Sequence, residues 1–123
     1  MIKTALLFAG QGAQSVGMGK VLAAQSPAAK AWFDRAGQVL GYDLAAICFE
    51  GPESELTKTE HAQPGIFLVG WIAFQLLKER VPSLAYGATA GLSLGEFTAL
   101  AAAGVMTFEE GLGLVRRRGQ FMQ

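Results

Sequence analysis

The feature that most constrains the fold is the run Gly91-Leu92-Ser93-Leu94-Gly95, which fits the pattern G-x-S-x-G. The small residues of 86–90 before it are typical of a buried strand, and the Ala- and Leu-rich stretch 96–103 after it favours a helix. A glycine two positions before and after the serine is needed where a strand turns sharply into a helix, because a Cβ there would clash. The pattern predicts that Ser93 is a nucleophile exposed on such a turn. In a chain with 16 glycines among 123 residues, a chance match is the alternative.

A second strand is predicted near the start of the chain. Residues 4–8 are apolar without polar alternation, which is typical of a parallel strand covered on both faces. Both predicted strands are followed by helical patterns, so the sequence predicts an α/β fold with a parallel sheet. A helical pattern begins near residue 19, and further helices are predicted over 27–40, 43–50, 64–80 and 107–118. The helix that begins near Gln63-Pro64 is apolar on nearly all sides, so we expect it to be central and buried.

The glycine-containing loop Gly10-Gln11-Gly12-Ala13-Gln14-Ser15 follows the first predicted strand. A dinucleotide site would need Gly or Ala where Ser15 stands, and an acidic residue after a second strand, so this interpretation fails. We expect instead that the backbone N–H of Gln11 points towards the sharp turn at Ser93, the nucleophile elbow, and forms an oxyanion hole with the N–H of Leu94. The alternative is an ordinary glycine-rich turn.

Two other polar features are candidates for the chemistry. His61 is the single histidine and a candidate base for Ser93, but its place in a polar stretch favours a loop or capping role. The run 116–118 consists of three arginines, and adjacent helical residues point about 100° apart, so only one of them can face a given pocket. In such a pocket, the guanidinium of that arginine is a natural partner for a substrate carboxylate. The remaining arginines are expected to be solvated.

The composition argues against several classes of protein. The chain is 51% hydrophobic and 16% charged with a net charge of zero, which gives no indication of nucleic-acid or anionic-membrane binding. The single Cys48 excludes an internal disulfide and a multi-cysteine zinc site, so a buried structural thiol is expected. No apolar run is long enough for a secretory or membrane-spanning segment, so we expect a soluble, cytoplasmic protein. So few charges suit one part of a larger domain better than a free-standing small one.

Four motifs, in register along the whole chain, resemble those of the malonyl-CoA:acyl carrier protein transacylases of fatty acid synthesis and the acyltransferase domains of polyketide synthases. The family patterns are F-x-G-Q-G-x-Q, L-x-x-T…Q-P-x-I-F, G-H-S-x-G-E and R-G-x-x-M-Q. The matching residues are Phe8-Ala9-Gly10-Gln11-Gly12-Ala13-Gln14 with Met18-Gly19, Leu56-Thr57 with Gln63-Pro64 and Ile66-Phe67, Gly91-Leu92-Ser93-Leu94-Gly95-Glu96, and Arg118-Gly119-x-x-Met122-Gln123.

The resemblance implies a role for five of the matching residues. Ser93 would be the acylated nucleophile, Gln11 and Leu94 the oxyanion donors, Arg118 the anchor of the malonyl carboxylate, and Gln63 a supporting pocket residue. The fold implied is an α/β-hydrolase-like parallel sheet with flanking helices, of which residues 1–123 would be the N-terminal part. The family's catalytic histidine and ferredoxin-like small subdomain lie further along a longer chain, so the resemblance implies that His61 is not the base. The sequence departs from the family at Leu92, where histidine is usual.

The function implied is transfer of malonyl from coenzyme A to the phosphopantetheine thiol of acyl carrier protein. Coenzyme A and phosphopantetheine would act as substrate carriers, with neither a separate cofactor nor a metal. Expected partners are malonyl-CoA, acyl carrier protein, and the remainder of the catalytic domain or a companion chain. The alternatives are a polyketide synthase acyltransferase domain, a non-catalytic fragment that needs a companion chain, and a serine esterase, which would leave Arg118 without a purpose.

Overall fold

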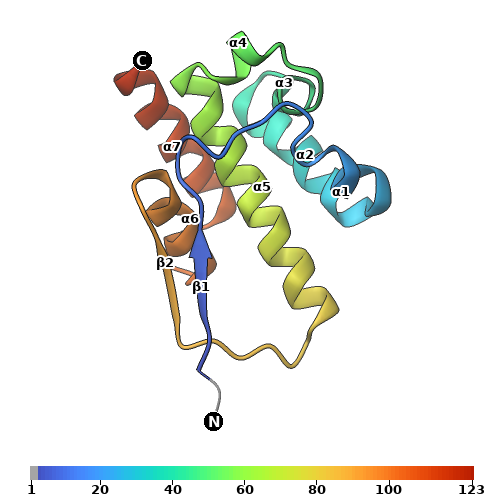
Figure 1. Ribbon diagram of the computed structural model, residues 1–123, viewed down its shortest axis with the longest axis vertical. Coiled ribbons are helices and arrows are strands. Elements are labelled where there is room, and N and C mark those ends of the chain that lie inside the picture. Colours follow the sequence, from blue (N-terminus) through green and yellow to red (C-terminus); the bar gives the residue numbers. More distant parts are fainter. Residues whose placement is uncertain (1–2) are drawn as a thin grey trace.

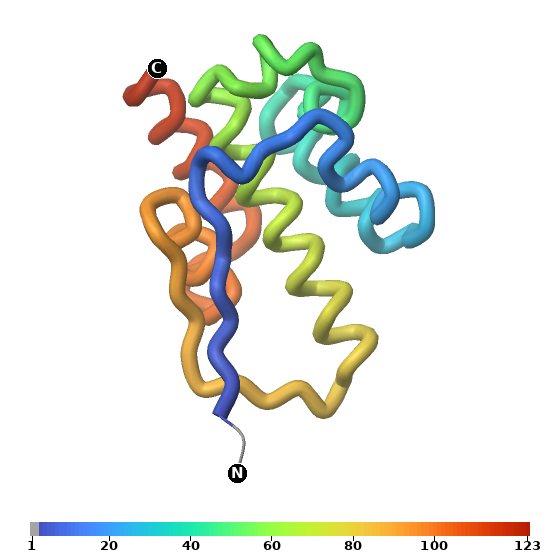
Figure 2. Tube along the Cα trace, viewed as in Figure 1, coloured from blue at the N-terminus to red at the C-terminus, as the bar shows by residue number. Residues whose placement is uncertain are grey.

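A computed structural model describes residues 3–123 of the chain. Figures 1 and 2 show two strands side by side, with the long α5 running diagonally beside them and the first three helices beyond it. The elements in chain order are β1 (Ala5–Phe8), α1 (Lys20–Gln25), α2 (Pro27–Leu40), α3 (Leu44–Glu50), α4 (Glu53–Leu56), α5 (Thr59–Arg80), β2 (Ala88–Gly91), α6 (Leu94–Ala102) and α7 (Phe108–Met122).

The two strands pair in parallel, as the sequence predicts. The register aligns Ala5 with Ala88 and Phe8 with Gly91, so both strands end at the same edge of the sheet. α6 begins almost directly after β2 and packs against both strands. The loop after β1 and the turn at Ser93 therefore leave the sheet together, at the edge where parallel α/β sheets bind their ligands.

One face of this sheet is open in the part of the chain that the structure describes. The ring of Phe8 packs edge-on against Phe74 of α5, with ring centroids 6.1 Å apart. On the other face Leu7 is 80% exposed, and the alanines beside it are exposed too, namely Ala5, Ala88 and Ala90. Residues 4–8 were predicted to be covered on both faces, and within residues 3–123 the helices cover one of them, so cover on the second face stays a prediction.

The predicted central helix is present as α5 and begins earlier than the sequence suggests. The run from Ala62 to Leu68 is buried throughout, and α5 packs against α2, α3, α6 and α7. The helix starts at Thr59 rather than near Gln63-Pro64. Pro64 lies inside the helix, in its second turn, where it lacks the N–H that would bond to the Glu60 carbonyl. Within residues 3–123, no helix combines the length and apolar character needed to cross a bilayer.

Local capping signals in the sequence correspond to helix ends in the structure. The Ser26 hydroxyl accepts a hydrogen bond from the Ala29 N–H at the start of α2. Thr107 opens α7 with the predicted capping box, in which its hydroxyl and the Glu110 carboxylate each accept from the other residue's backbone N–H. The four-residue α4 was not predicted, because it is too short to show a hydrophobic period.

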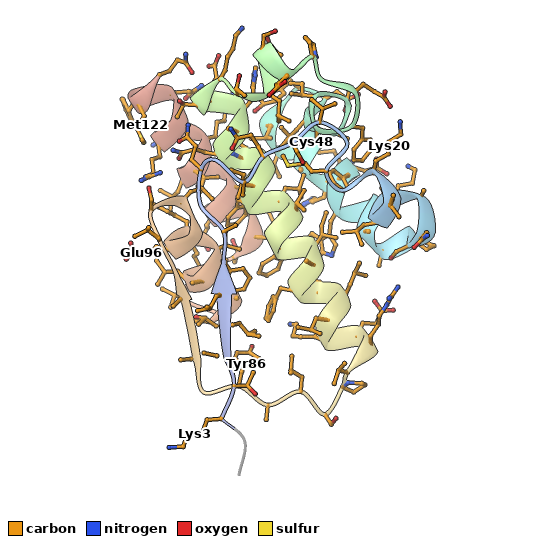
Figure 3. All side chains as sticks on the ribbon, in the orientation of Figure 1. Lys3, Lys20, Cys48, Tyr86, Glu96 and Met122 are labelled. Carbon is orange, nitrogen blue, oxygen red and sulfur yellow. The ribbon has the colours of Figure 1, made fainter. Side chains whose placement is uncertain are left out.

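The core lies between α5 and the helices packed on it. Trp71 of α5 contacts Trp32 of α2 and Phe108 of α7, with ring centroids 5.5 and 5.6 Å away. Cys48 is fully buried, as predicted, and Figure 3 shows it inside the helical layer. Burial raises the pKa of its thiol to about 12. The thiol therefore stays protonated near neutral pH and is not a nucleophile.

Residues 1–123 expressed alone are expected to self-associate, because an open apolar sheet face and unpaired strand edges bind similar surfaces. Leu7→Lys should shift the distribution towards monomer in analytical ultracentrifugation. Val105 is 70% exposed between α6 and α7, so Val105→Lys adds the same charge outside the sheet and is the matched control. A monomeric unaltered chain, or an equal effect of both substitutions, would contradict this expectation.

Candidate active site

Ser93 lies on the sharp turn predicted between β2 and α6. Its backbone has φ 57° and ψ −114°, and among residues 3–123 it is the one non-glycine residue with a positive φ. This conformation is strained for a residue with a Cβ and persists only where the surroundings enforce it. The side chain is exposed, and Ser93 is the N-cap residue of α6. The turn therefore presents the hydroxyl at the positive end of a helix.

Glycines bring three backbone segments together around this turn. A Cβ on Gly95 would collide with the carbonyl oxygen of Phe8 at the end of β1, and a Cβ on Gly91 would collide with Gly95 itself. A Cβ on Gly10, in the loop after β1, would lie 2.6 Å from the carbonyl oxygen of Leu92. These contacts give the physical reason for both glycines of the predicted elbow, and they place the loop after β1 directly against it.

Two backbone N–H groups at this edge have no hydrogen-bond acceptor within residues 3–123. One belongs to Gln11, in the loop that follows β1. The other belongs to Leu94, the first residue of α6, whose N–H cannot bond within its own helix. Both groups are free to donate to an oxygen atom from outside the chain.

Arg118 of α7 connects the serine to the interior. Its Nη2 donates to the Ser93 Oγ at 2.9 Å, and its Nη1 donates to the Gln63 Oε1 at 2.9 Å. The guanidinium also lies over the ring of Phe97, 5.4 Å from the centroid. Arg116 instead lies over the Tyr42 ring and Arg117 is exposed. The structure thus brings one arginine of the predicted run to Ser93, and that arginine is Arg118.

Gln63 links Arg118 to the loop after β1. Its side chain is fully buried. Its Nε2 donates to the Gln11 Oε1 at 3.1 Å and to the Met122 sulfur at 3.3 Å. The carboxamide of Gln11 donates in turn to the Thr59 Oγ1 at 3.3 Å. The structure therefore connects Ser93, Arg118, Gln63 and Gln11 in one hydrogen-bonded cluster.

Sequence reasoning missed three residues that complete this cluster. They are Thr59, which accepts from Gln11, Met122, which accepts from Gln63, and Phe97, which carries the guanidinium of Arg118. The available signal was in the motifs, because L-x-x-T started at Leu56 ends on Thr59, and R-G-x-x-M-Q includes Met122. Helical spacing adds that Thr59 stands one turn before Gln63 and Met122 one turn after Arg118.

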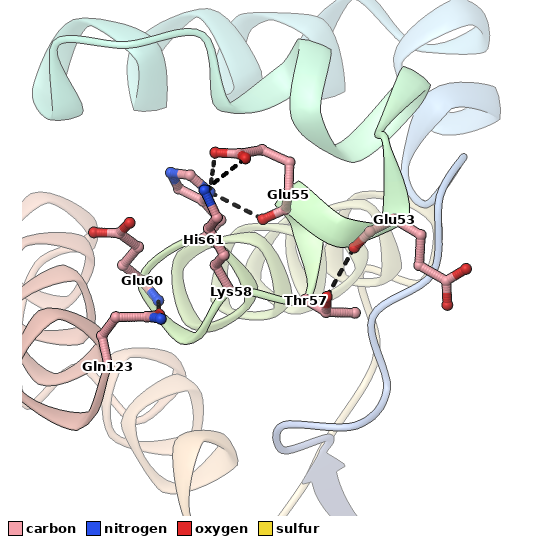
Figure 4. A network of polar contacts seen from close by, with 7 residues as sticks. All are labelled: Glu53, Glu55, Thr57, Lys58, Glu60, His61 and Gln123. Carbon is pink, nitrogen blue, oxygen red and sulfur yellow. Dashed lines mark hydrogen bonds and ion pairs between the residues drawn. The ribbon is translucent and has the colours of Figure 1, made fainter.

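His61 lies in the first turn of α5 and faces α4 (Figure 4). Its Nδ1 lies 3.0 Å from the backbone oxygen of Glu55 and 3.2 Å from the Glu55 carboxylate. Its ring contacts Tyr42, with centroids 5.5 Å apart. Within residues 3–123, Ser93 has a hydrogen bond with Arg118 and none with His61. The hydrogen bond from Lys58, with the charges of Lys58 and His61, lowers the pKa of the Glu55 carboxyl.

A glycine also sets the distance between α7 and α5. A Cβ on Gly119 would lie 2.8 Å from the Thr59 carbonyl oxygen and 2.9 Å from the Glu60 Cα. The absence of a side chain lets α7 approach the first turn of α5, which brings Arg118 and Met122 to Gln63. The glycine of the Arg118-Gly119 pair is thus explained by packing.

Two other features bear on the chemistry of the site. The side chain of Leu92, where the family usually has histidine, is 84% exposed and offers no polar contact beside Ser93. Within the described residues, no three His, Cys, Asp or Glu side chains gather where they could hold a metal ion.

The sequence matches a known family over nearly its whole length. The family model described as the acyl transferase domain matches residues 5–123, and the chain belongs to this family. The malonyl CoA-acyl carrier protein transacylase of Bacillus subtilis is 45% identical over 122 residues, which cover 99% of this chain and 38% of that protein. The resemblance stated from the motifs is confirmed.

Solved structures of such enzymes share the fold. The transacylase structure from Helicobacter pylori has a TM-score of 0.94 at 39% identity, covering 100% of this chain and 40% of that chain. A malonyl-transacylase in complex with a type II PKS acyl-carrier protein has a TM-score of 0.90 at 40% identity, covering 99% of this chain and 39% of that chain. The predicted α/β class is confirmed. The chain spans about two fifths of the length of these relatives.

Gly119→Ala in the complete protein is expected to lower the free energy of unfolding by about 1–3 kcal/mol, because the added methyl group overpacks the contact between α7 and α5. Gly113 lies on the same helix with open space around its Cβ position. Gly113→Ala should therefore stabilise the protein by about 0.5–1 kcal/mol through helix propensity. Urea denaturation measures both changes. Equal effects of the two substitutions would contradict the packing argument.

Proposed function

We propose that the protein containing this segment transfers a malonyl group from coenzyme A to the phosphopantetheine thiol of an acyl carrier protein, through an acyl-enzyme on Ser93. The observation that carries the proposal is the guanidinium of Arg118, 2.9 Å from the Ser93 Oγ. A carboxylate is a stronger acceptor than a hydroxyl, so it would take this donor over from Ser93. Malonyl fits because only one methylene separates its carboxylate from the thioester carbonyl that the serine attacks.

The free backbone N–H groups of Gln11 and Leu94 suit the second requirement of acyl transfer. Attack on the thioester places a negative charge on the carbonyl oxygen. Preorganised N–H donors and the N-terminus of α6 would stabilise that charge more than they stabilise the neutral substrate. We assign these two groups to the oxyanion hole on this ground.

The reaction has two balanced steps. In the first, the Ser93 Oγ forms a bond to the malonyl carbonyl carbon, the carbon–sulfur bond to coenzyme A breaks, and the serine proton leaves with the thiol. In the second, the carrier thiol forms the new carbon–sulfur bond, the bond to Oγ breaks, and the proton returns to Ser93. No oxidation state changes, so coenzyme A and phosphopantetheine act only as carriers. The related transacylase bound to an acyl-carrier protein supports the proposed partner.

We assign residues 1–123 to one part of a catalytic domain whose base is supplied by the remainder of that domain or by a companion chain. His61 is engaged with Glu55 rather than with Ser93. The related proteins are more than twice as long as the segment that matches. The open sheet face around Leu7 offers an apolar surface for further packing. Segment 1–123 alone should therefore lack turnover.

The complete protein incubated with malonyl-CoA is expected to carry the malonyl group on Ser93, because that hydroxyl alone lies on the strained turn beside the free N–H groups. Peptide mapping by mass spectrometry locates the label. Ser93→Ala should abolish it. A label on another residue, or an undiminished label in Ser93→Ala, would refute the assignment.

Arg118→Ala should lower malonyl transfer far more than acetyl transfer. The lost charge-assisted pair is worth roughly 2–4 kcal/mol in a partly desolvated pocket, which is about 30- to 1000-fold in kcat/KM. Acetyl has no carboxylate and should be affected much less. The exposed Arg117 supplies the control, since Arg117→Ala removes the same charge at a position about 100° around the helix from Arg118. Equal losses for malonyl and acetyl would show that Arg118 has only a structural role.

A further inference from the structure

A chain of hydrogen bonds with a single direction runs from Arg118 to Thr59. Arg118 Nη1 donates to Gln63 Oε1 at 2.9 Å, Gln63 Nε2 to Gln11 Oε1 at 3.1 Å, and Gln11 Nε2 to Thr59 Oγ1 at 3.3 Å. The direction follows from the guanidinium, which has only N–H donors. Gln63 must turn its oxygen to Arg118 and its NH₂ group to Gln11. Gln11 must then turn its NH₂ group to Thr59.

At the buried end of this series of hydrogen bonds, the donor–acceptor direction cannot reverse at low cost. Gln63 is fully buried, and its second N–H donates to the Met122 sulfur at 3.3 Å. A flipped carboxamide would direct N–H groups at the guanidinium of Arg118 and leave the Gln11 oxygen without a donor. Unpaired buried polar groups cost far more than exposed ones, so the orientation of Gln63 is fixed.

At its exposed end, this series of hydrogen bonds holds the loop after β1 against α5. Within residues 10–15 the backbone N–H bonds stay inside the loop, from Gly12 to the Gln14 Oε1 and from Ala13 to the Gly10 oxygen. Further along the same loop, the Gly17 N–H donates to the Cys48 carbonyl of α3 at 2.8 Å. The carboxamide of Gln11 makes the loop's hydrogen bonds to α5, one with Gln63 and one with Thr59. The orientation of Gln11 therefore depends on an acceptor at Thr59.

We propose that Thr59 is a positioning residue for the acyl transfer. Its hydroxyl orients the carboxamide of Gln11, and the carboxamide holds the backbone N–H of Gln11 where the oxyanion forms. This inference rests on the proposed function. The oxyanion is absent from the bound substrate and forms on the way to the tetrahedral intermediate, so Thr59 acts on kcat. The substrate carboxylate still meets Arg118, so KM is preserved.

The test uses the complete protein with malonyl-CoA and rapid-quench measurement of Ser93 acylation. Thr59→Val keeps the shape of the side chain and removes the acceptor, and is expected to lower the saturated rate constant about 3- to 10-fold, with KM within about 2-fold. The burst amplitude, which counts folded active sites, should not change. Thr59→Ser restores the acceptor and the rate. The matched control is Thr57→Val, because the exposed Thr57 hydroxyl donates to the Glu53 carbonyl and not to the loop.

A double-mutant cycle with Gln11→Met gives the decisive readout, because this variant removes the carboxamide and keeps the backbone N–H. In the Gln11→Met background, Thr59→Val should have almost no further effect on the rate constant. Additive losses, a fall in amplitude alone, or an equal effect of Thr57→Val would overturn the inference while leaving Ser93 acylation established. Failure of the unaltered protein to label at Ser93 would overturn the proposed function and this inference together.

Discussion

The site depends on backbone segments that lie closer together than side chains permit. Gly95 allows the start of α6 to rest on the last carbonyl group of β1, so the strand end and the elbow form one rigid unit. Gly119 allows α7 to rest in the same way on the first turn of α5. The hydroxyl, the guanidinium and the buried carboxamide are on three different elements. These two contacts hold those elements at hydrogen-bonding distance.

Local patterns carried most of the information that the sequence offers. The elbow, the two strand segments and the capping box at Thr107 were predicted because each depends on residues a few positions apart. The parallel pairing of the strands was inferred from the order of strands and helices. The register of the Arg118-Gly119 motif singled out the arginine that lies at Ser93. The role of each of these residues in catalysis stays a prediction until the variants are measured.

The features that the sequence did not reveal depend on distant contacts. The start of α5 was predicted near Gln63-Pro64, but the helix begins at Thr59, where its packing against α7 begins. The hydrogen bond between Gln11 and Thr59 joins residues 48 positions apart, which no local period encodes. The strand at residues 4–8 has the composition of a doubly covered strand. Composition alone does not say which residues cover each face.

At Ser93, the residue that would be most stable in this positive-φ backbone differs from the residue that the reaction needs. A residue with a Cβ held at φ 57° and ψ −114° carries a strain of about 1–3 kcal/mol. Glycine would relieve this strain and remove the hydroxyl. Evolution under selection for stability alone would therefore move this position towards glycine. A homologue with glycine at this position would be a stable pseudoenzyme, which keeps the fold around the elbow and lacks the nucleophile.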